Sequence, residues 1–279
     1  MNWFIKFLLF LQSEMTAPEP YGWYHLMWIG ITVLALVFLF LSRKHWGERQ
    51  QRWVLGIYGI VAATTELLKQ VSWSFEWAAE TQSAIWDYQW YAAPFQLCTT
   101  PIYLSLLCLF LKKGKIRDGC LACLSMFTIL GGLMTIIIPS SCFCSDTLAN
   151  IHTMWLHCGG FVLSVYLLMS GAVKLETRTW IYGVFGFLAL VCIALALNFG
   201  VYHSGILGDE TFNMFYISPY FISVLPVFDA IQQAVPYPVF LALYIVGLTL
   251  GSLVVFWVAK AIAHGVKKYK QRVCEPVNK

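Results

Sequence analysis

The feature that most constrains this chain is a series of seven apolar windows, each long enough to cross a lipid bilayer. The hydrocarbon core of a bilayer is about 30 Å thick, which a helix of roughly 20 apolar residues spans. Unpaired backbone groups in lipid are costly, so such windows are expected to be α-helices. The sequence therefore predicts an all-α, polytopic membrane protein, a single bundle of seven transmembrane helices at residues 21–42, 53–71, 94–111, 119–138, 151–172, 180–199 and 238–262.

Composition excludes the main alternatives to a membrane protein. Only 11% of the residues are charged and 59% are hydrophobic, whereas roughly 25% are charged in an ordinary soluble domain. The net charge of +4 is carried in short blocks between apolar windows, which leaves no extended basic surface for a nucleic acid. The nine cysteines lie mostly inside apolar windows, unlike the framework of a disulfide-rich secreted domain.

The distribution of basic residues predicts the orientation of the bundle. Lysine and arginine in short loops mark the cytoplasmic side of a membrane protein. Sixteen of the 18 basic residues lie after the first, third and fifth windows or at and beyond the end of the seventh, while the alternate loops carry Asp and Glu. The N-terminus is therefore expected outside and the C-terminus in the cytoplasm. Residues 1–20 are predicted to be an interfacial segment, residues 200–237 an outer loop, and residues 263–279 a basic cytoplasmic tail. The membrane would be the plasma membrane of a bacterium or an endomembrane of a eukaryote.

This orientation gathers the polar side chains of the windows in the outer half of the bundle. Ionisable groups inside membrane spans are rare and are functional by default. Glu66 and Lys69 are three residues apart, which favours a mutual ion pair on one helix face. His152 has a simpler interpretation as a helix-entry residue close to solvent. The polar residues that we predict to support a site or bind a substrate are Glu66, Gln96, His152, Asn198 and Asn213.

Cys98 and His157 are the candidate catalytic pair. Pro94 reads as a first-turn proline, so Cys98 is expected near a positive helix N-terminus, where a thiolate is favoured. Pro101 cannot donate a backbone hydrogen bond and is expected to open the helix beside the thiol. Both residues lie a few positions from the outer end of their windows, which places them at similar depths. Gly159 and Gly160 would let another helix approach closely beside His157.

The spacing of the other cysteines does not predict a metal site. Cys120 and Cys123, and Cys142 and Cys144, are spaced like zinc ligands. The two pairs, however, flank the fourth window and would be separated by about 30 Å of hydrocarbon. We therefore predict no metal and no cofactor, and we expect Cys142 and Cys144, in an exposed loop, to be dispensable.

Three motifs carry a resemblance to a known family. FQLCTTPIYL, IHTMWLHCGGFVLSVYL, and NFGVYHSGILGDETFNMFYISP followed by VPYPVFLALYIVGL resemble, in order and spacing, the YwaF-like integral membrane proteins. That family includes the transmembrane protein 164 group of cysteine-dependent acyltransferases, which move a fatty acyl chain between phospholipids and whose bundle is similar to that of the androgen-induced hydrolases. The resemblance implies Cys98 as nucleophile, His157 as its partner, and Asn213 in the third motif. The chain departs from the usual bacterial pattern at Gln96, where a histidine often precedes the Leu-Cys pair.

The sequence thus favours a membrane phospholipid acyltransferase, or a lipase-like acyl hydrolase, with an outward-facing site. Phospholipids and lysophospholipids would be its partners, and Gln96, Asn213 or backbone N–H groups would stabilise the oxyanion. The principal alternative is a transporter or ligand-binding membrane protein that uses Glu66, Asn198, Asn213 and the histidines without covalent chemistry. A third is a structural protein that packs through Gly247 and Gly251.

Overall fold

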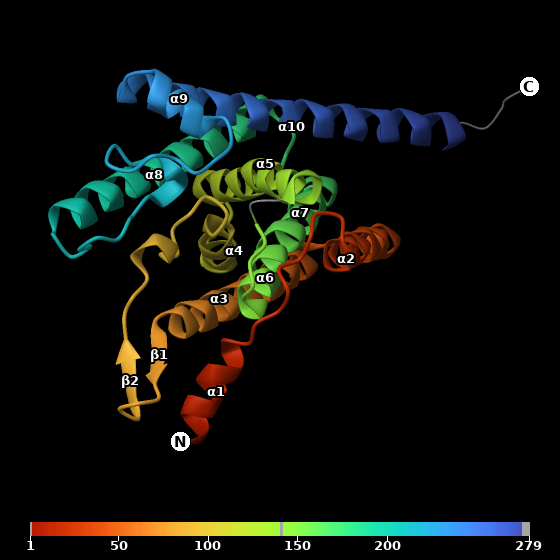
Figure 1. Cartoon of the computed structure of the whole chain (residues 1–279). Coiled ribbons are helices and arrows are strands. Elements are labelled where there is room, and N and C mark those ends of the chain that lie inside the picture. The colour runs from red at the N-terminus through yellow and green to blue at the C-terminus, as the bar shows by residue number, and fades with distance from the viewer. Residues whose placement is uncertain (1, 140–141, 275–279) are drawn as a thin grey trace, which may run out of the picture.

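The computed structural model describes residues 2–139 and 142–274, and most of them are helical (Figure 1). Within these ranges, six helices are long and apolar enough to cross a membrane. The elements, in chain order, are α1 (Trp3–Leu11), α2 (Trp23–Leu41), η1 (Ser42–His45), α3 (Glu48–Trp73), β1 (Phe75–Ala78), β2 (Ser83–Trp86), η2 (Trp90–Ala92), α4 (Thr100–Phe110), α5 (Lys115–Ile137), α6 (Thr147–Met154), η4 (Trp155–Gly159), α7 (Gly160–Met169), α8 (Thr177–His203), η5 (Met214–Tyr216), α9 (Phe228–Ala234) and α10 (Tyr237–Cys274).

The third predicted window is only partly helical. We expected a helix over residues 94–111, but α4 begins at Thr100 and has 11 residues. Pro101, rather than Pro94, occupies the first turn, where a missing N–H costs nothing because the first four N–H groups of a helix have no partner within it. Pro101 therefore starts α4 instead of opening its hydrogen-bond ladder. Cys98 lies two residues before the helix, and the prediction that it sits inside the first turns is wrong.

The chain around α4 nevertheless follows α3 along most of its length. Near the end of α3, Gln70 Nε2 donates to the Ala92 carbonyl at 2.7 Å. Midway, a Cβ built on Gly59 would lie only 2.6 Å from Ser105 Oγ, so the two helices are in close contact. At the start of α3, Lys113 Nζ lies 2.8 Å from Glu48 Oε2. Residues 92–113 thus run antiparallel to a stretch of α3 that is about 33 Å long.

The fifth predicted window forms a single span with an irregularity at its centre. α6 and α7 are joined by η4, a π-helical turn that contains His157. The prediction of close approach is confirmed for Gly160, whereas a Cβ on Gly159 would lie at an ordinary contact distance, 3.5 Å, from the Tyr58 ring. A Cβ on Gly160 would lie 2.7 Å from the Thr128 methyl group on α5 and 3.2 Å from the Tyr58 hydroxyl on α3.

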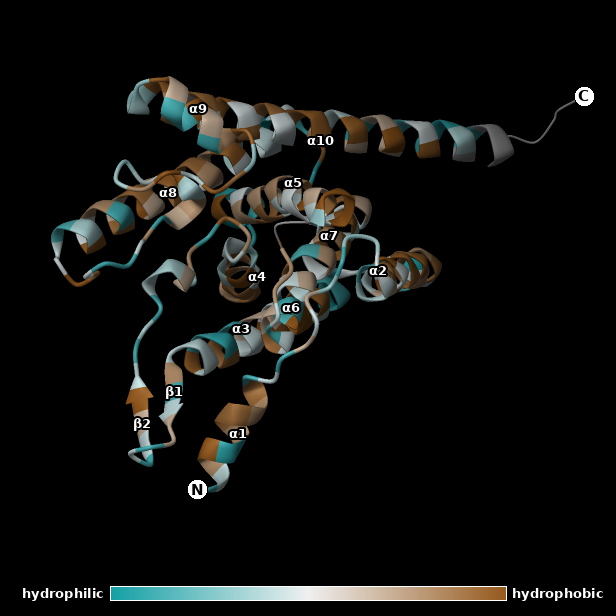
Figure 2. Ribbon diagram, viewed as in Figure 1, coloured by the Kyte–Doolittle hydropathy of each residue, from teal (hydrophilic) through white to brown (hydrophobic). Residues whose placement is uncertain are grey.

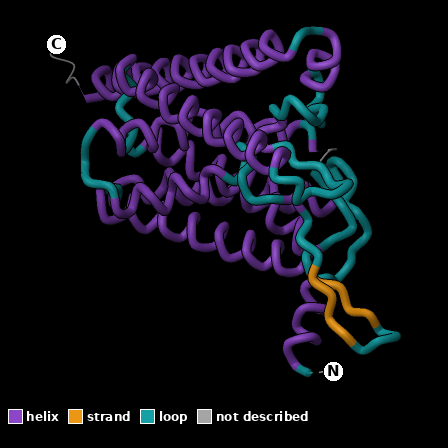
Figure 3. Tube along the Cα trace, turned by 90° about the vertical axis from the view of Figure 1, so that its left-hand side faces the viewer, coloured by secondary structure: helices purple, strands orange, loops and turns teal. Residues whose placement is uncertain are grey.

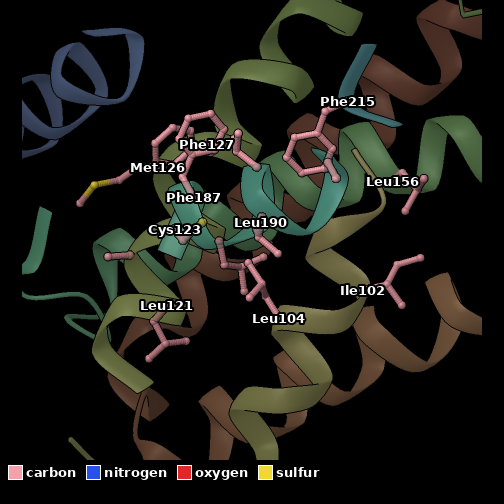
Figure 4. Close-up of a cluster of buried hydrophobic side chains, with 14 of the residues drawn as sticks. Ile102, Leu104, Leu121, Cys123, Met126, Phe127, Leu156, Phe187, Leu190 and Phe215 are labelled. Carbon is pink, nitrogen blue, oxygen red and sulfur yellow. The ribbon is translucent and has the colours of Figure 1, made fainter. Parts of the chain in front are cut away.

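α5 lies at the centre of the bundle and packs most extensively against α8. Gly183 on α8 lets the two backbones approach, since a Cβ there would lie 3.0–3.1 Å from Ala122 and the Cys123 nitrogen. Phe127 and Phe187 stack beside this contact with ring centroids 4.4 Å apart (Figure 4). Small residues and stacked rings are the usual means by which membrane helices associate, because lipid supplies no hydrophobic drive between them.

Apolar side chains also cover much of the outside of the bundle. Figure 2 shows hydrophobic residues predominating along α2 and along much of α8 and α10. Phe38 on α2 and Val254 on α10 are more than 60% exposed. A large exposed apolar surface is unsuited to water and suits a surface in contact with lipid.

The irregular chain and the hairpin of β1 and β2 gather at one end of the bundle, together with α1 (Figure 3). The C-terminal end of α10 points to the opposite end in the same view. α10 continues helically to Cys274, so the predicted end of the last span at residue 262 is not a helix end. No proline interrupts residues 263–274, and nothing else there stops the helix. The helical part of residues 1–20, predicted to be interfacial, is α1.

Candidate functional site

A buried ionic cluster lies where α3 meets α6. Glu66 Oε1 lies 2.9 Å from Lys69 Nζ and accepts a hydrogen bond from Gln70 Nε2 at 2.7 Å. Glu66 Oε2 lies 2.7 Å from His152 Nε2, at ion-pair distance but without the alignment of a hydrogen bond. His152 Nδ1 lies 2.8 Å from the Thr65 hydroxyl. A hydroxyl, an imidazole and a carboxylate therefore lie next to one another between two helices that are candidate membrane spans.

This cluster confirms one expectation and corrects another. The predicted ion pair of Glu66 and Lys69 is present. The interpretation of His152 as a residue close to solvent is wrong, because its side chain is buried against α3. Burying a carboxylate is costly unless charged and hydrogen-bonding partners compensate it, and Lys69, Gln70 and His152 together supply them. The spacing of Glu66 and Lys69 reveals only the pairing within one helix, whereas the partner on α6 is a tertiary contact.

Cys98 lies within electrostatic range of this cluster. It is half-buried, in the irregular segment between η2 and α4. A thiolate there would interact electrostatically with Glu66 and Lys69 of α3 and with Cys142 in the loop after α5. Tyr216 in η5 is also within range of the thiol. Cys98 therefore lies within electrostatic range of several segments that are distant in the sequence.

His157 faces α5 from the π-helical turn. Its imidazole lies against Gly131, where an added Cβ would be 3.7 Å from Nδ1, and its carbonyl oxygen would be 2.6 Å from a Cβ on Gly132. His157 is half-buried and close enough to His152 for the two rings to interact electrostatically. In the described ranges no hydrogen bond joins Cys98 to His157, and their pairing stays a prediction. A π-helical turn is frequently found at functional sites, but nothing in the sequence pattern indicates one here.

Three side-chain amides, one of them two residues before Cys98, fix the loop at residues 213–222. Gln96 donates to the Asn213 carbonyl at 2.9 Å and accepts from the Phe215 nitrogen at 2.8 Å. Asn198 binds both the carbonyl and the nitrogen of Met214, at 3.0 and 2.7 Å. Asn213 donates to two carbonyls, those of Phe221 and Ile222. These residues thus support the site by holding its backbone, and their predicted contact with an oxyanion or substrate stays a prediction.

The loop that these amides hold is strained. Phe215 and Tyr216 have φ values of 59° and 56°, in the left-handed region that side chains other than glycine seldom adopt. Phe215 is fully buried and stacks on Phe95, with centroids 5.7 Å apart. Such strain persists only where surrounding contacts enforce it, and it concentrates at functional sites. The amides Gln96 and Asn198 are those contacts.

Two further features complete the polar end of the bundle. A cavity of about 460 Å³ opens beside the end of α3, and its lining includes Glu14, Ser72, Trp73 and Asp146. Ser72 Oγ is buried without a hydrogen-bond partner in the described ranges.

Across residues 2–139 and 142–274, no three His, Cys, Asp or Glu side chains are arranged to hold a metal ion.

Sequence reasoning missed several residues of this region, including Thr65, Gln70, Tyr58 and the strained pair at 215–216. Thr65 and Gln70 flank Glu66 on α3, so helical spacing alone could have indicated Gln70 at i+4. The contact of the Tyr58 hydroxyl with the Leu156 carbonyl, at 3.2 Å, joins two helices and leaves no trace in local spacing.

Comparison with known proteins gives one match. A family model described as the TMEM164 family matches residues 20–258. No curated protein and no solved structure matches the chain.

Proposed function

The chain belongs to the TMEM164 family, and from this premise we propose that it is a membrane-embedded acyltransferase that uses Cys98 as its nucleophile. Its substrates are a phospholipid that donates the acyl chain and a lysophospholipid that accepts it. Water in place of the acceptor would make the same chemistry a lipase-like hydrolysis. The observation that supports it is a half-buried thiol, Cys98, within electrostatic range of the buried ionic cluster and two residues after Gln96, which holds the strained loop.

The proposed reaction has two acyl-transfer steps. Cys98 Sγ attacks the ester carbonyl carbon while His157 accepts the thiol proton. The ester C–O bond then breaks, His157 returns the proton to the leaving oxygen, and a lysophospholipid departs from the acyl-thioester. The hydroxyl of the acceptor attacks the thioester and loses its proton to His157. The C–S bond breaks, and the sulfur regains that proton.

Cys98 and His157 share two local features. Both are half-buried, and each lies in an irregular part of the backbone, before α4 and in η4. Catalytic hydrogen bonds are often long or absent before a substrate binds. We propose that side-chain rotation brings the His157 imidazole to the thiol when the ester is bound. Glu66 and His152 would hold the cluster beside the site, and backbone N–H groups near Cys98 would stabilise the oxyanion.

The test is direct capture of the thioester. Purified protein in vesicles is incubated with a phospholipid that carries an alkyne-tagged acyl chain, and the tag is then read on the denatured protein. We expect a label that hydroxylamine removes and that Cys98→Ser lacks. Cys192→Ser, which removes an exposed cysteine from α8, is the matched control and should label normally. An unlabelled wild-type protein in vesicles where labelled lipid is otherwise available would overturn the proposal.

We also propose seven crossings, with the N-terminus outside. Residues 92–113 follow about 33 Å of α3, which supports treating α4 with its preceding segment as the seventh crossing despite its short helix. The test is an introduced cysteine at Lys113, between α4 and α5, in a variant whose other accessible cysteines are serine. We expect an impermeant thiol reagent to label it only after the cells are opened, and labelling in intact cells would contradict this orientation.

A ligand-binding function without covalent chemistry is the second candidate. The cavity beside Glu14, Ser72 and Asp146 favours it, because a buried hydroxyl without a partner lines a polar space there. The labelling experiment separates the two candidates, since a transporter or receptor forms no thioester on Cys98.

A further inference from the structure

The last helix is much longer than a membrane requires. α10 has 38 residues and is about 57 Å long, against a hydrocarbon core of about 30 Å. Tyr237 begins the helix, and Trp257 lies about 30 Å further along it. Lys260 Nζ lies 5.0 Å from the centroid of the Trp257 ring. Tryptophan, tyrosine and lysine are the residues that anchor a span at the membrane surface, so residues 261–274 lie outside the hydrocarbon core.

The described side chains of this extension do not pack against the rest of the bundle. All side chains from residue 261 to residue 269 are exposed, and Figure 1 shows the C-terminal end of α10 projecting beyond the other helices. Ile262, Val266 and Tyr269 are 60%, 51% and 69% exposed. Their spacing of four and three residues places them on one side of the helix. The extension therefore presents an apolar stripe with no partner in the described chain.

The same extension is strongly basic. Residues 260–274 contain five Lys and Arg and no Asp or Glu. Lys260 and Lys267 lie about two turns apart, on the side of the helix opposite the apolar stripe. A helix with an apolar stripe, a lysine-rich opposite face and a position next to a membrane span is the form that binds an anionic lipid surface.

We propose that residues 260–274 are a docking surface for anionic phospholipid headgroups of the adjacent leaflet. The lysines bind the headgroup phosphates, and Ile262, Val266 and Tyr269 enter the boundary between headgroups and acyl chains. Complementary charge selects this occupant over a second copy of the chain, because two such segments would repel each other. The predicted orientation places the surface on the cytoplasmic leaflet, and the proposal does not depend on the chemistry at Cys98.

The test titrates the full-length protein in neutral detergent with phosphatidylglycerol or phosphatidylcholine and counts bound lipids by native mass spectrometry. The variant Lys260→Gln with Lys267→Gln and Lys268→Gln should weaken phosphatidylglycerol binding by at least about tenfold and leave phosphatidylcholine binding unchanged. The matched control changes Lys112, Lys113 and Lys115 to Gln, which removes the same charge from the loop between α4 and α5 and from the first residue of α5. It should weaken binding by less than about threefold.

A second variant tests the apolar stripe without changing the charge. Ile262→Ser with Val266→Ser should also weaken phosphatidylglycerol binding, and the oligomeric state of the variant should be the same as that of the wild type. Equal losses in the two lysine variants, or equal binding of the two lipids by the wild type, would overturn the proposal. A dimer that disappears in the serine variant would assign the stripe to a second copy and overturn it as well.

Discussion

The end of the bundle that carries the loops and the contact between α5 and α8 are held together by different interactions. At the loop end, Glu66 is compensated by Lys69 and His152, and side-chain amides fix a strained loop. Between α5 and α8, Gly183 and the stacked pair Phe127 and Phe187 provide close packing with little polar contact. The polar region is costly to build in a membrane, whereas the packed region is what any helical membrane protein needs. This difference is what we expect if the proposed function depends on the loop end and the α5–α8 contact contributes to stability alone.

The largest expected effect is on activity at the loop end. If Cys98 and His157 act as one unit, then Cys98→Ala, His157→Ala and the double variant should each lower acyl transfer by at least about 10³-fold, with no further loss in the double variant. Transfer of a tagged acyl chain to a lysophospholipid measures the rate. The midpoint of thermal unfolding in detergent should be nearly the same for Cys98→Ala and the wild type. This result would separate a catalytic role of Cys98 from a structural one. Losses that add in the double variant would show that the two residues act independently.

The next effect is on stability, again at the loop end. Glu66→Ala leaves Lys69 and His152 buried without their shared partner, and breaking a buried ion pair in this way costs about 3–5 kcal/mol. Glu66→Gln keeps a side-chain oxygen for Lys69 and Gln70 and should cost distinctly less. Chemical unfolding in detergent micelles gives both values. If the two variants were equally stable, the carboxylate would contribute nothing as a charge, and the proposed contrast between the regions would weaken.

A smaller effect is expected in the α5–α8 contact. Gly183→Leu introduces a side chain where a Cβ already lies 3.0–3.1 Å from Ala122 and the Cys123 backbone. Overpacking of this kind typically costs about 1–3 kcal/mol. Gly200→Leu is the matched control, because nothing lies within 4 Å of a Cβ at that position of α8. The folded fraction of the Gly183→Leu variant should transfer acyl chains at the wild-type rate per molecule. A selective loss of rate in the Gly183 variant would place part of the function in this contact.

These regions also differ in how far the sequence predicts them. Apolar windows predict the helices of the packed region because burial in lipid depends on length and composition alone. The ion pair of Glu66 and Lys69 is predictable because it lies within one helix. The addition of His152 is not, because the depth and rotation of α6 against α3 depend on packing. The sequence predicts the wrong start for α4 because both Pro94 and Pro101 are suited to the first turn of a helix. The π-helical turn at His157 and the hairpin at residues 75–86 likewise depend on tertiary contacts.

The smallest expected effect is that of replacing two cysteines at the loop end. It would show that not every residue of this region is needed for activity. Cys142 and Cys144 are half-buried rather than exposed as we predicted, yet the Asn150 side chain binds Cys144 through its backbone, at 3.1 Å to the nitrogen and 2.7 Å to the carbonyl. Cys142 Sγ lies 3.8 Å from Thr135 Oγ1. Because a hydrogen bond to sulfur at this distance is weak, replacing the thiol with a hydroxyl should cost little stability. The free energy of unfolding of the double serine variant should therefore lie within about 1 kcal/mol of the wild-type value, and its activity should be unchanged.

Asn150→Ala is the contrasting variant. It removes both backbone hydrogen bonds to Cys144 and should lower the free energy of unfolding by about 1–3 kcal/mol. Loss of acyl transfer in the serine variant would instead show that a second thiol takes part beside Cys98.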